Sequence, residues 1–293
     1  ELSGVPGIGR GKACSVLAAA ELGRRFMMED SGLEKKPLIS ARMIYELMLP
    51  NLKGIEKEEW SKFASPDEKN RIRLGVNQVL IRGSDVNILI DAGLGTKIRE
   101  SKRKAMGLSA SVTMEEKLAN FGLTTDDITH VVFSHLHFDH CAGVTEISGN
   151  DILPVFANAV FVIQVEEWQA AVAPDEISKS SYALKDFLPL QQTGRLKLVN
   201  GNIEITDGIF LEVTGGHTKG HQIVRVEDEK SNFIYIGDIC PTSFHLDSDR
   251  HEAFDLYPLN TITARKRLLR YASKRKSIIF FPHDLGGNLY RII

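Results

Sequence analysis

The segment His135-Leu136-His137-Phe138-Asp139-His140 places three imidazoles and a carboxylate within six residues. Neutral imidazole nitrogens and carboxylate oxygens are the ligands that zinc and similar divalent ions accept. Residues 128–134, just before it, are rich in β-branched and aromatic side chains and predict a short strand. The alternative is a polar turn that happens to hold histidine. The whole chain has only nine His, so the grouping favours a metal site at the end of a strand.

Other side chains of the same kinds also follow predicted strands. A glycine-rich turn, 215–221, separates two strands, and its glycines allow the tight bend that brings an imidazole inward. Because every candidate stands at a strand end, all of them can gather on one rim of a sandwich. These further candidates are His217 and His221 in the turn, Asp238, His283 and Asp91.

The remaining pattern predicts the elements that position these residues. Strands come in consecutive groups with helices between them, which indicates two sheets with helices packed outside. We expect strands at 76–81, 86–90, 159–164, 203–205, 210–214, 223–227, 233–236 and 277–281. We expect helices at 114–121, 165–172, 182–188 and 261–274.

From about residue 63 to the C-terminus, the chain resembles the metallo-β-lactamase-fold superfamily of hydrolases. The resemblance rests on the HxHxDH segment, the GHTxGH-like turn, the Gly-Asp pair after a strand and the last strand-end histidine, in that order. It implies an α+β fold, a four-layer αββα sandwich over residues 63–293, preceded by a helical segment over 1–62.

The resemblance also implies a dinuclear site, with two Zn²⁺ ions, or iron or manganese in their place. The ions share a hydroxide that attacks the substrate, and Asp139 orients this nucleophile as the catalytic residue. Asp91 and His221 are expected to support the ligands. The ligands would be His135, His137 and His217 for one ion, Asp139, His140 and His283 for the other, and Asp238 bridging both.

Within the superfamily the sequence favours hydrolysis of a small ester, lactone or phosphoester. Phe138 stands where di-iron flavoproteins place an acidic ligand, and the short gaps after His217 hold no inserted domain. The chain is most similar to acyl-homoserine lactonases and organophosphate hydrolases. Lactonases carry a substrate-contacting Tyr where this chain has Pro241, so His245 and Tyr257 are the candidates to contact the substrate.

The N-terminal residues leave a second hypothesis open. Residues 1–60 resemble the helix-hairpin-helix start of RadC-type proteins, which suggests a DNA-associated phosphodiesterase or nuclease as the alternative function. A helical cap on the hydrolase, or a metal-binding scaffold without activity, are the other readings. The net charge of −2 and the balanced charges of this segment favour a small-molecule substrate over nucleic acid.

The composition sets the remaining expectations. The chain shows neither a signal peptide nor an apolar run long enough to span a membrane, and its three cysteines suggest no disulfide framework. We therefore expect a cytoplasmic protein, and the sequence does not predict its oligomeric state. The basic stretch Arg265–Lys276 is expected to be a solvated helix on the outside of the sandwich.

Overall fold

A computed structural model describes residues 61–109, 112–228, 232–247, 250–285 and 289–291. The chain divides into two units, Glu1–Ile72 and Arg73–Ile293, and the second contains every predicted ligand. In the described part of the first unit, the Asp67 carboxylate accepts hydrogen bonds from the backbone N–H groups of Lys69 and Arg71, both at 2.9 Å. The predicted helix-hairpin-helix segment lies outside the described residues, apart from 61–62. The boundary at residue 62 stays a prediction.

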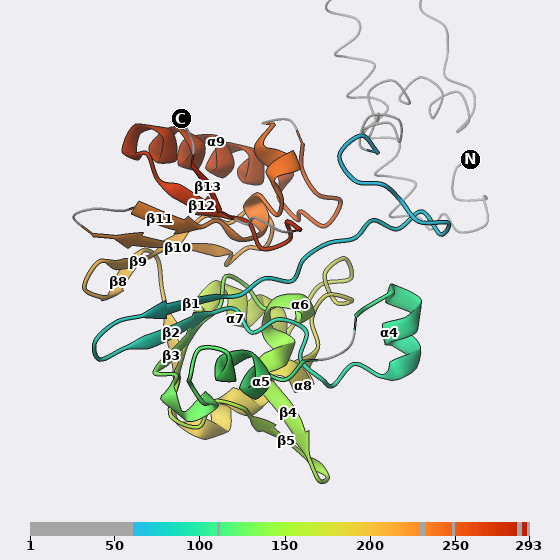
Figure 1. The fold of residues 1–293 in the computed structure, drawn as a ribbon, viewed down its shortest axis with the longest axis vertical. Coiled ribbons are helices and arrows are strands. Elements are labelled where there is room, and N and C mark those ends of the chain that lie inside the picture. The colour runs from blue at the N-terminus through green and yellow to red at the C-terminus, as the bar shows by residue number, and fades with distance from the viewer. Residues whose placement is uncertain (1–60, 110–111, 229–231, 248–249, 286–288, 292–293) are drawn as a thin grey trace, which may run out of the picture. The chain divides into compact units, whose positions relative to one another are not determined.

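Two sheets form the centre of the second unit (Figure 1). The first has the order β1-β2-β3-β6-β7, in which β2, β3, β6 and β7 run parallel. Its strands are β1 Val79–Arg82, β2 Asn87–Ile90, β3 His130–Val132, β6 Val160–Gln164 and β7 Leu196–Val199. The second has the order β13-β12-β11-β10-β9-β8. Its strands are β8 Ile203–Thr206, β9 Ile209–Val213, β10 Gln222–Glu227, β11 Asn232–Tyr235, β12 Ile278–Phe280 and β13 Leu289–Arg291. A separate hairpin pairs β4 Thr145–Ser148 with β5 Asp151–Pro154.

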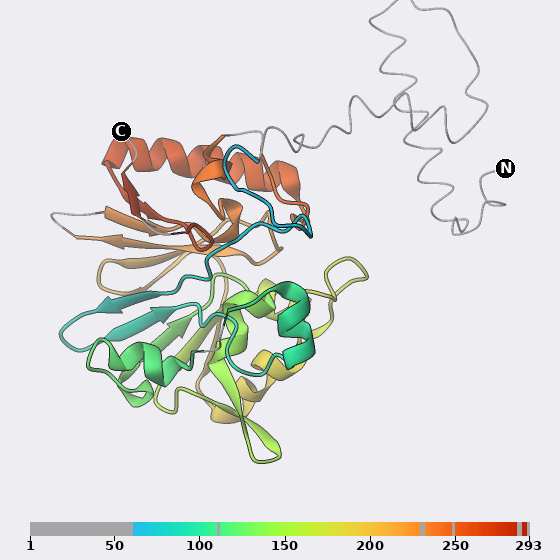
Figure 2. The same cartoon turned by 45° about the vertical axis from the view of Figure 1, so that its right-hand side comes forward.

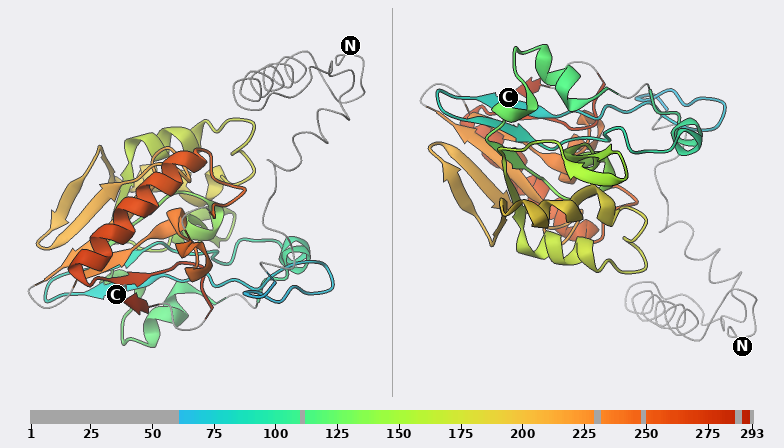
Figure 3. Two further views of the ribbon diagram at one scale, coloured as in Figure 1. Left: turned by 90° about the horizontal axis from the view of Figure 1, so that it is seen from above. Right: turned by 90° about the horizontal axis from the view of Figure 1, so that it is seen from below.

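Helices cover the outer faces of both sheets (Figures 1 and 3). Helix α9 lies across the second sheet, whereas α5, α7 and α8 lie on the outer side of the first. The helices are α4 Glu100–Met106, α5 Met114–Ala119, α6 Phe138–Cys141, α7 Val165–Val172, α8 Leu184–Phe187 and α9 Pro258–Arg275. Short 3-10 helices are η3 Thr125–Asp127, η4 Ala142–Val144, η5 Leu188–Thr193, η6 Gly237–Ile239 and η7 Ser243–Leu246.

The strands of the two sheets contribute to three apolar cores, and a single strand reaches two of them because successive side chains point to opposite faces. In β2, Ile88 and Ile90 are buried in the core between the sheets, whereas Leu89 packs in the core beneath the helices. In β10, Val224 belongs to the core between the sheets and Ile223 to the core under α9. The predicted αββα sandwich is therefore confirmed.

Some features of the fold were not predicted. Helix α4, the hairpin β4–β5 and the strands β7 and β13 carry no strong periodicity over their short lengths. The expectation that the basic stretch of α9 is solvated was wrong at Arg265, which is 0% exposed. Its Nη1 donates to the carbonyl oxygen of His245, so one turn of the helix directs its charge inward. Among the described residues, no helix combines the length and apolar character needed to cross a membrane.

Candidate metal centre

The predicted ligands come from four segments, which follow the strands β3, β9, β11 and β12. His135 and His137 come after β3, and Asp139 and His140 lie in α6, which begins directly behind them. His217 lies in the turn between β9 and β10, where Gly216 has φ +92° and a Cβ would meet the backbone of Thr261 at 2.6 Å. Asp238 lies in η6 after β11, and His283 follows β12. The sequence thus predicted the strand-end placement correctly.

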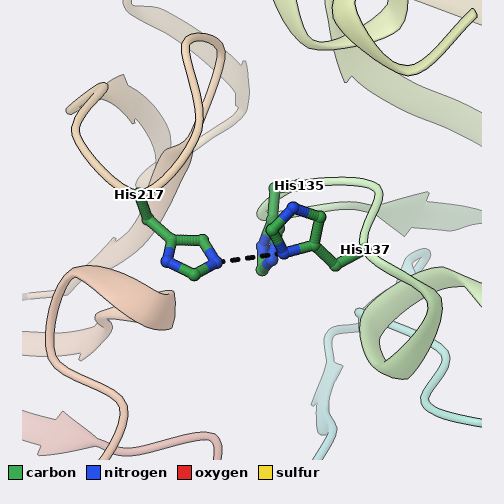
Figure 4. Close-up of side chains that lie close together, drawn as sticks. All are labelled: His135, His137 and His217. Carbon is green, nitrogen blue, oxygen red and sulfur yellow. Dashed lines mark hydrogen bonds between the residues drawn. The ribbon is translucent and has the colours of Figure 1, made fainter. Parts of the chain in front are cut away.

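Three imidazoles form the first group. The side chains of His135, His137 and His217 point toward one another from two different loops (Figure 4). Nδ1 of His137 and Nε2 of His217 lie 3.1 Å apart, and all three residues are at least 94% buried. The group has the donor set of a three-histidine zinc site.

The second group combines Asp139, His140 and His283. Nε2 of His140 and Nε2 of His283 lie 3.2 Å apart, and Oδ2 of Asp139 is 3.8 Å from Nε2 of His283. Asp139 is the most exposed of these side chains, at 28%. Its carboxylate therefore stands at the open side of the cluster.

Asp238 lies between the two groups. Its Oδ2 is 3.5 Å from Nε2 of His217 and 3.3 Å from Nε2 of His140. Its Oδ1 is 3.3 Å from Nε2 of His283. One carboxylate thus faces an imidazole of the first group and two imidazoles of the second.

These separations fit metal coordination. Ligand atoms at ~2.0–2.1 Å from a tetrahedral ion lie roughly 3.3 Å from one another, close to the distances around Asp238. Buried polar atoms normally have hydrogen-bond partners. Nε2 of His135, Nε2 of His137 and Oδ1 of Asp238 are buried and have none. The described residues therefore include groups that could hold metal ions, and the residues fit two of them.

The charges in the cluster favour a cation. Burial alone would lower the pKa of His140, but the carboxylates of Asp238, Asp139 and Asp91 raise it well above its usual value. Burial also opposes protonation of His283, yet Asp238 raises its pKa to about 9. His135 is farther from this charge, and burial lowers its pKa well below the usual value. A field that favours protons on imidazole also favours a divalent ion there.

Asp91 contacts the segment that carries the candidate ligands His135 and His140. Its Oδ2 is 2.8 Å from Nδ1 of His140 and accepts hydrogen bonds from the hydroxyls of Ser134, at 2.7 Å, and Tyr235, at 2.6 Å. Its Oδ1 accepts from the backbone N–H of Ser134 at 2.7 Å. Asp91 is 1% exposed and has φ +56°. The carboxylate orients the His140 ring so that Nε2 faces the cluster.

His221 contacts Asp238 through the backbone. Its Nε2 accepts a hydrogen bond from the backbone N–H of Asp238 at 3.0 Å, and its Nδ1 is 2.6 Å from Oγ1 of Thr214. Burial and the neighbouring His217 lower the pKa of His221 to about 3. The ring is therefore neutral, and its acceptor nitrogen fixes the start of η6 where Asp238 stands.

Two carboxylates near His217 were not predicted. Nδ1 of His217 is 3.0 Å from Oδ1 of Asp255 and 3.4 Å from Oε2 of Glu252. Burial opposes protonation of His217, but the hydrogen bond to Asp255 raises its pKa to about 9. Burial and Asp238 raise the pKa of Glu252 to about 7. No local pattern in the sequence showed that the segment that follows these carboxylates folds back onto the turn, where the N–H of Leu256 donates to the carbonyl oxygen of His217.

Glu167 is a further residue that the sequence did not indicate. It is 1% exposed, and its carboxylate accepts hydrogen bonds from the backbone N–H of Leu136 at 2.9 Å, the Tyr182 hydroxyl at 3.0 Å and the Thr218 hydroxyl at 2.5 Å. Leu136 and Thr218 are neighbours of metal-ligand candidates in two separate loops. Glu167 therefore joins the two loops that supply the first group.

The two substrate-pocket candidates lie on different loops. His245 is in η7, where Nδ1 is 2.9 Å from Oγ1 of Thr242. This loop begins at Pro241, whose carbonyl oxygen accepts a hydrogen bond from the N–H of His283 at 2.9 Å. Tyr257 donates its backbone N–H to Gly216 at 2.8 Å, and its side chain is 44% exposed. Both loops thus contact segments that carry ligand candidates.

Comparison with known proteins identifies the family of the chain. Residues 71–283 match the metallo-beta-lactamase superfamily model. An N-acyl homoserine lactonase of Bacillus thuringiensis is 28% identical over 218 residues, which cover 70% of this chain and 80% of that protein. The crystal structure of a probable metal-dependent hydrolase from Staphylococcus aureus has a TM-score of 0.74 at 32% identity, covering 82% of this chain and 88% of the other.

A third relative is an N-acyl homoserine lactone hydrolase whose structure holds the product N-hexanoyl-L-homoserine at the catalytic metal center. It has a TM-score of 0.58 at 26% identity and covers 77% of this chain and 88% of the other. The family match spans more than half of the chain and includes every ligand candidate. The chain belongs to the metallo-beta-lactamase superfamily and is a metal-dependent hydrolase.

Proposed function

We propose that the protein hydrolyses the ring ester of a small lactone, or a closely related ester, at a site that holds two zinc ions. The position of Asp238 carries this proposal, because one buried carboxylate lies within 3.3–3.5 Å of imidazole nitrogens in both groups. His135, His137 and His217 would hold one ion. Asp139, His140 and His283 would hold the other, and Asp238 would contribute a ligand to both.

Two zinc ions, when bound, lower the pKa of water and polarise the carbonyl oxygen of an ester. The chain's own residues supply orientation and proton transfer. Asp139, as the most exposed carboxylate of the cluster, orients the attacking water and accepts its proton at a carboxylate oxygen. Asp91 and Asp255 hold the imidazoles of His140 and His217, so that the ligand cluster keeps its geometry during the reaction.

The lactone is favoured over a phosphoester by the relatives, whose names specify lactone hydrolysis. Pro241 cannot supply the hydroxyl that a tyrosine would offer at this position. Thr242 and His245 follow it on the same loop, which is bound to the His283 segment. His245 and Tyr257 contact the substrate in this proposal, and they set the range of esters that the protein accepts.

A panel of lactones, aryl esters and phosphoesters tests the proposal. With zinc we expect lactone turnover to exceed that of every phosphoester, and a chelator to abolish it. Asp139→Asn should lower kcat for the lactone by at least about 100-fold, because the carboxylate that accepts the proton is lost. Faster turnover of a phosphodiester than of any lactone or ester would contradict the proposal. So would turnover that a chelator leaves unchanged.

A further inference from the structure

Helix α4 is a basic element with no buried residue. It carries Lys102, Arg103 and Lys104 against the single acid Glu100, and Arg99 precedes it. Figures 1 and 2 both place α4 outside the sandwich, on the side where α6 begins. A helix that buries no apolar face contributes little to the core. The charges of α4 and its location beside α6 are therefore the features that can give it a function.

The base of this helix is fixed beside the ligand helix. Lys97, which is 5% exposed, donates through Nζ to the carbonyl oxygens of Ala142 and Thr145, and Nζ lies 3.3 Å from Oδ1 of Asp186. Ala142 directly follows α6, the helix that carries Asp139 and His140. The buried ammonium thus holds the start of the α4 segment at a defined place relative to the metal-ligand candidates.

One side chain of α4 contacts the rim of the site itself. Nζ of Lys102 lies 5.2 Å from the ring centroid of Phe138, within the range of a cation–π contact. Phe138 stands between His137 and Asp139, and its backbone N–H donates to Ser181 at 3.0 Å. The Lys102 ammonium therefore contacts the residue that stands in the chain between candidate ligands of the two metal ions.

The charges of α4 are only partly neutralised. Glu100 lies 3.9 Å from Nζ of Lys104 and 4.0 Å from Nε of Arg103. Within the residues that the structure describes, Lys102 and Arg99 are exposed and have no carboxylate within ion-pair distance. An exposed cation at the mouth of a site attracts substrates of opposite charge.

We propose that the substrate carries an anionic group at the end remote from its scissile ester, and that Lys102 recognises this group. This inference rests on the proposed ester or lactone hydrolysis and adds a charge to the substrate class. The shared chemistry is a carboxylate or phosphate on the acyl side. The ammonium is the specificity-determining group, and Phe138 positions it.

Three homoserine lactones of equal acyl length test this recognition. Their chains are hexanoyl, which ends in a methyl group, adipoyl, which ends in a carboxylate, and a hexanoyl chain that ends in phosphate. The wild-type protein should show a kcat/KM several-fold higher for the anionic lactones than for the neutral one. This preference should shrink between about 0.05 M and 0.5 M NaCl, since salt screens exposed charges. The two anionic chains decide between carboxylate and phosphate.

The variant Lys102→Glu should lower the anionic-to-neutral ratio by roughly tenfold, because the charge is reversed rather than only removed. Lys104→Glu is the matched control. It makes the same charge change on the same helix, at a lysine that is 78% exposed and lies near Glu100, and should alter the ratio less than about twofold. Unchanged thermal unfolding of both variants shows that neither effect comes from misfolding.

Equal kcat/KM values for the neutral and anionic lactones would overturn the inference and leave the hydrolase proposal intact. Equal effects of Lys102→Glu and Lys104→Glu would also overturn it, because a general field would then explain the preference. If no lactone is hydrolysed, the proposed lactone hydrolysis fails, and binding of the matching lactams by calorimetry still ranks the anionic against the neutral chains. Tighter binding of the anionic lactams supports the inference, and equal binding rejects it.

Discussion

At the scale of single residues, Asp238 is a buried carboxylate whose charge depends on its neighbours. Burial would raise the pKa of its carboxyl, but His140 and His283 hold that pKa well below its usual value. A charged carboxylate at 5% exposure is stabilised only by such positive partners. The charged form of Asp238 therefore needs positive partners, and the proposed zinc ions would be such partners.

Replacing Asp238 with Asn should remove the shared ligand. We expect bound zinc to fall from two ions per chain toward one, and lactone turnover to fall by at least about 100-fold. Metal analysis after gel filtration and initial rates measure the two effects. Asp151→Asn in the exposed turn end of β5 is the control and should change neither. Full zinc content in the Asp238 variant would contradict its bridging role.

The lowered pKa of His245 predicts that the free energy of unfolding depends on pH. Burial and the charge of Arg265 lower its pKa from 6.5 to about 4 in the folded protein. Between pH 6.5 and about pH 4, the His245 side chain binds a proton in the unfolded chain but not in the folded protein. The contribution is therefore fully present above pH 6.5 and is lost as the pH falls toward 4.

Acid unfolding of the wild type and of His245→Asn, both with chelator, measures this contribution. From pH 7.5 to 4.5 the wild type should lose roughly 1–3 kcal/mol more of its free energy of unfolding than the variant. This energy difference is smaller than the full pKa shift of His245 would give, because the side chain is partly exposed and solvent screens its charge. Parallel curves for the two proteins would show that His245 does not titrate in this way.

At the scale of elements, the first residue of η6, which follows β11, needs to be a glycine. Gly237 has φ +56°, and a Cβ there would lie 2.4 Å from Nε2 of His221. Gly237→Ala should therefore combine backbone strain with displacement of the ring that holds the N–H of Asp238. Gly122 has a similar φ of +68° with nothing within 4 Å of a Cβ, so Gly122→Ala carries the strain alone.

We expect Gly122→Ala to lower Tm by roughly 2–4 °C and Gly237→Ala by at least twice as much, with loss of bound metal only in the latter. Calorimetry and metal analysis of the two variants separate strain from the steric contact. Equal values of Tm would mean that the contact with His221 relaxes without cost.

Glu167 in α7 connects two ligand loops, and Glu166 beside it provides a matched control. Glu167→Gln replaces a carboxylate that accepts three hydrogen bonds with an amide whose NH₂ group would face donors. Zinc affinity should fall by roughly 10–100-fold. Glu166→Gln removes only a surface ion pair with Lys219 at 3.1 Å and should leave the affinity unchanged. Equal affinities for both variants would remove Glu167 from the support of the site.

At the scale of the whole molecule, the sequence predicted the sandwich and the placement of the ligand candidates after strands because both depend on local patterns. Alternation in β2 and β10 and the residue types after β3 are visible in short windows. Asp255 and Glu252 were missed because no periodicity shows that their loop folds back onto His217. Glu167 was missed because the pattern that predicts its helix, α7, does not show which loops the helix contacts. Arg265 was misjudged because a charged residue in a basic helix is normally solvated.

Zinc titration into metal-free protein tests the proposed two-zinc site and the proposed lactone hydrolysis together. The rate of proton release from N-hexanoyl homoserine lactone is followed at each ratio of zinc to protein. The dinuclear site predicts that hydrolysis rises until two zinc ions are bound per chain and then stays constant. Two tightly bound zinc ions without hydrolysis of this lactone or its adipoyl analogue would contradict the proposed function. Hydrolysis at full rate before any zinc is added would do the same.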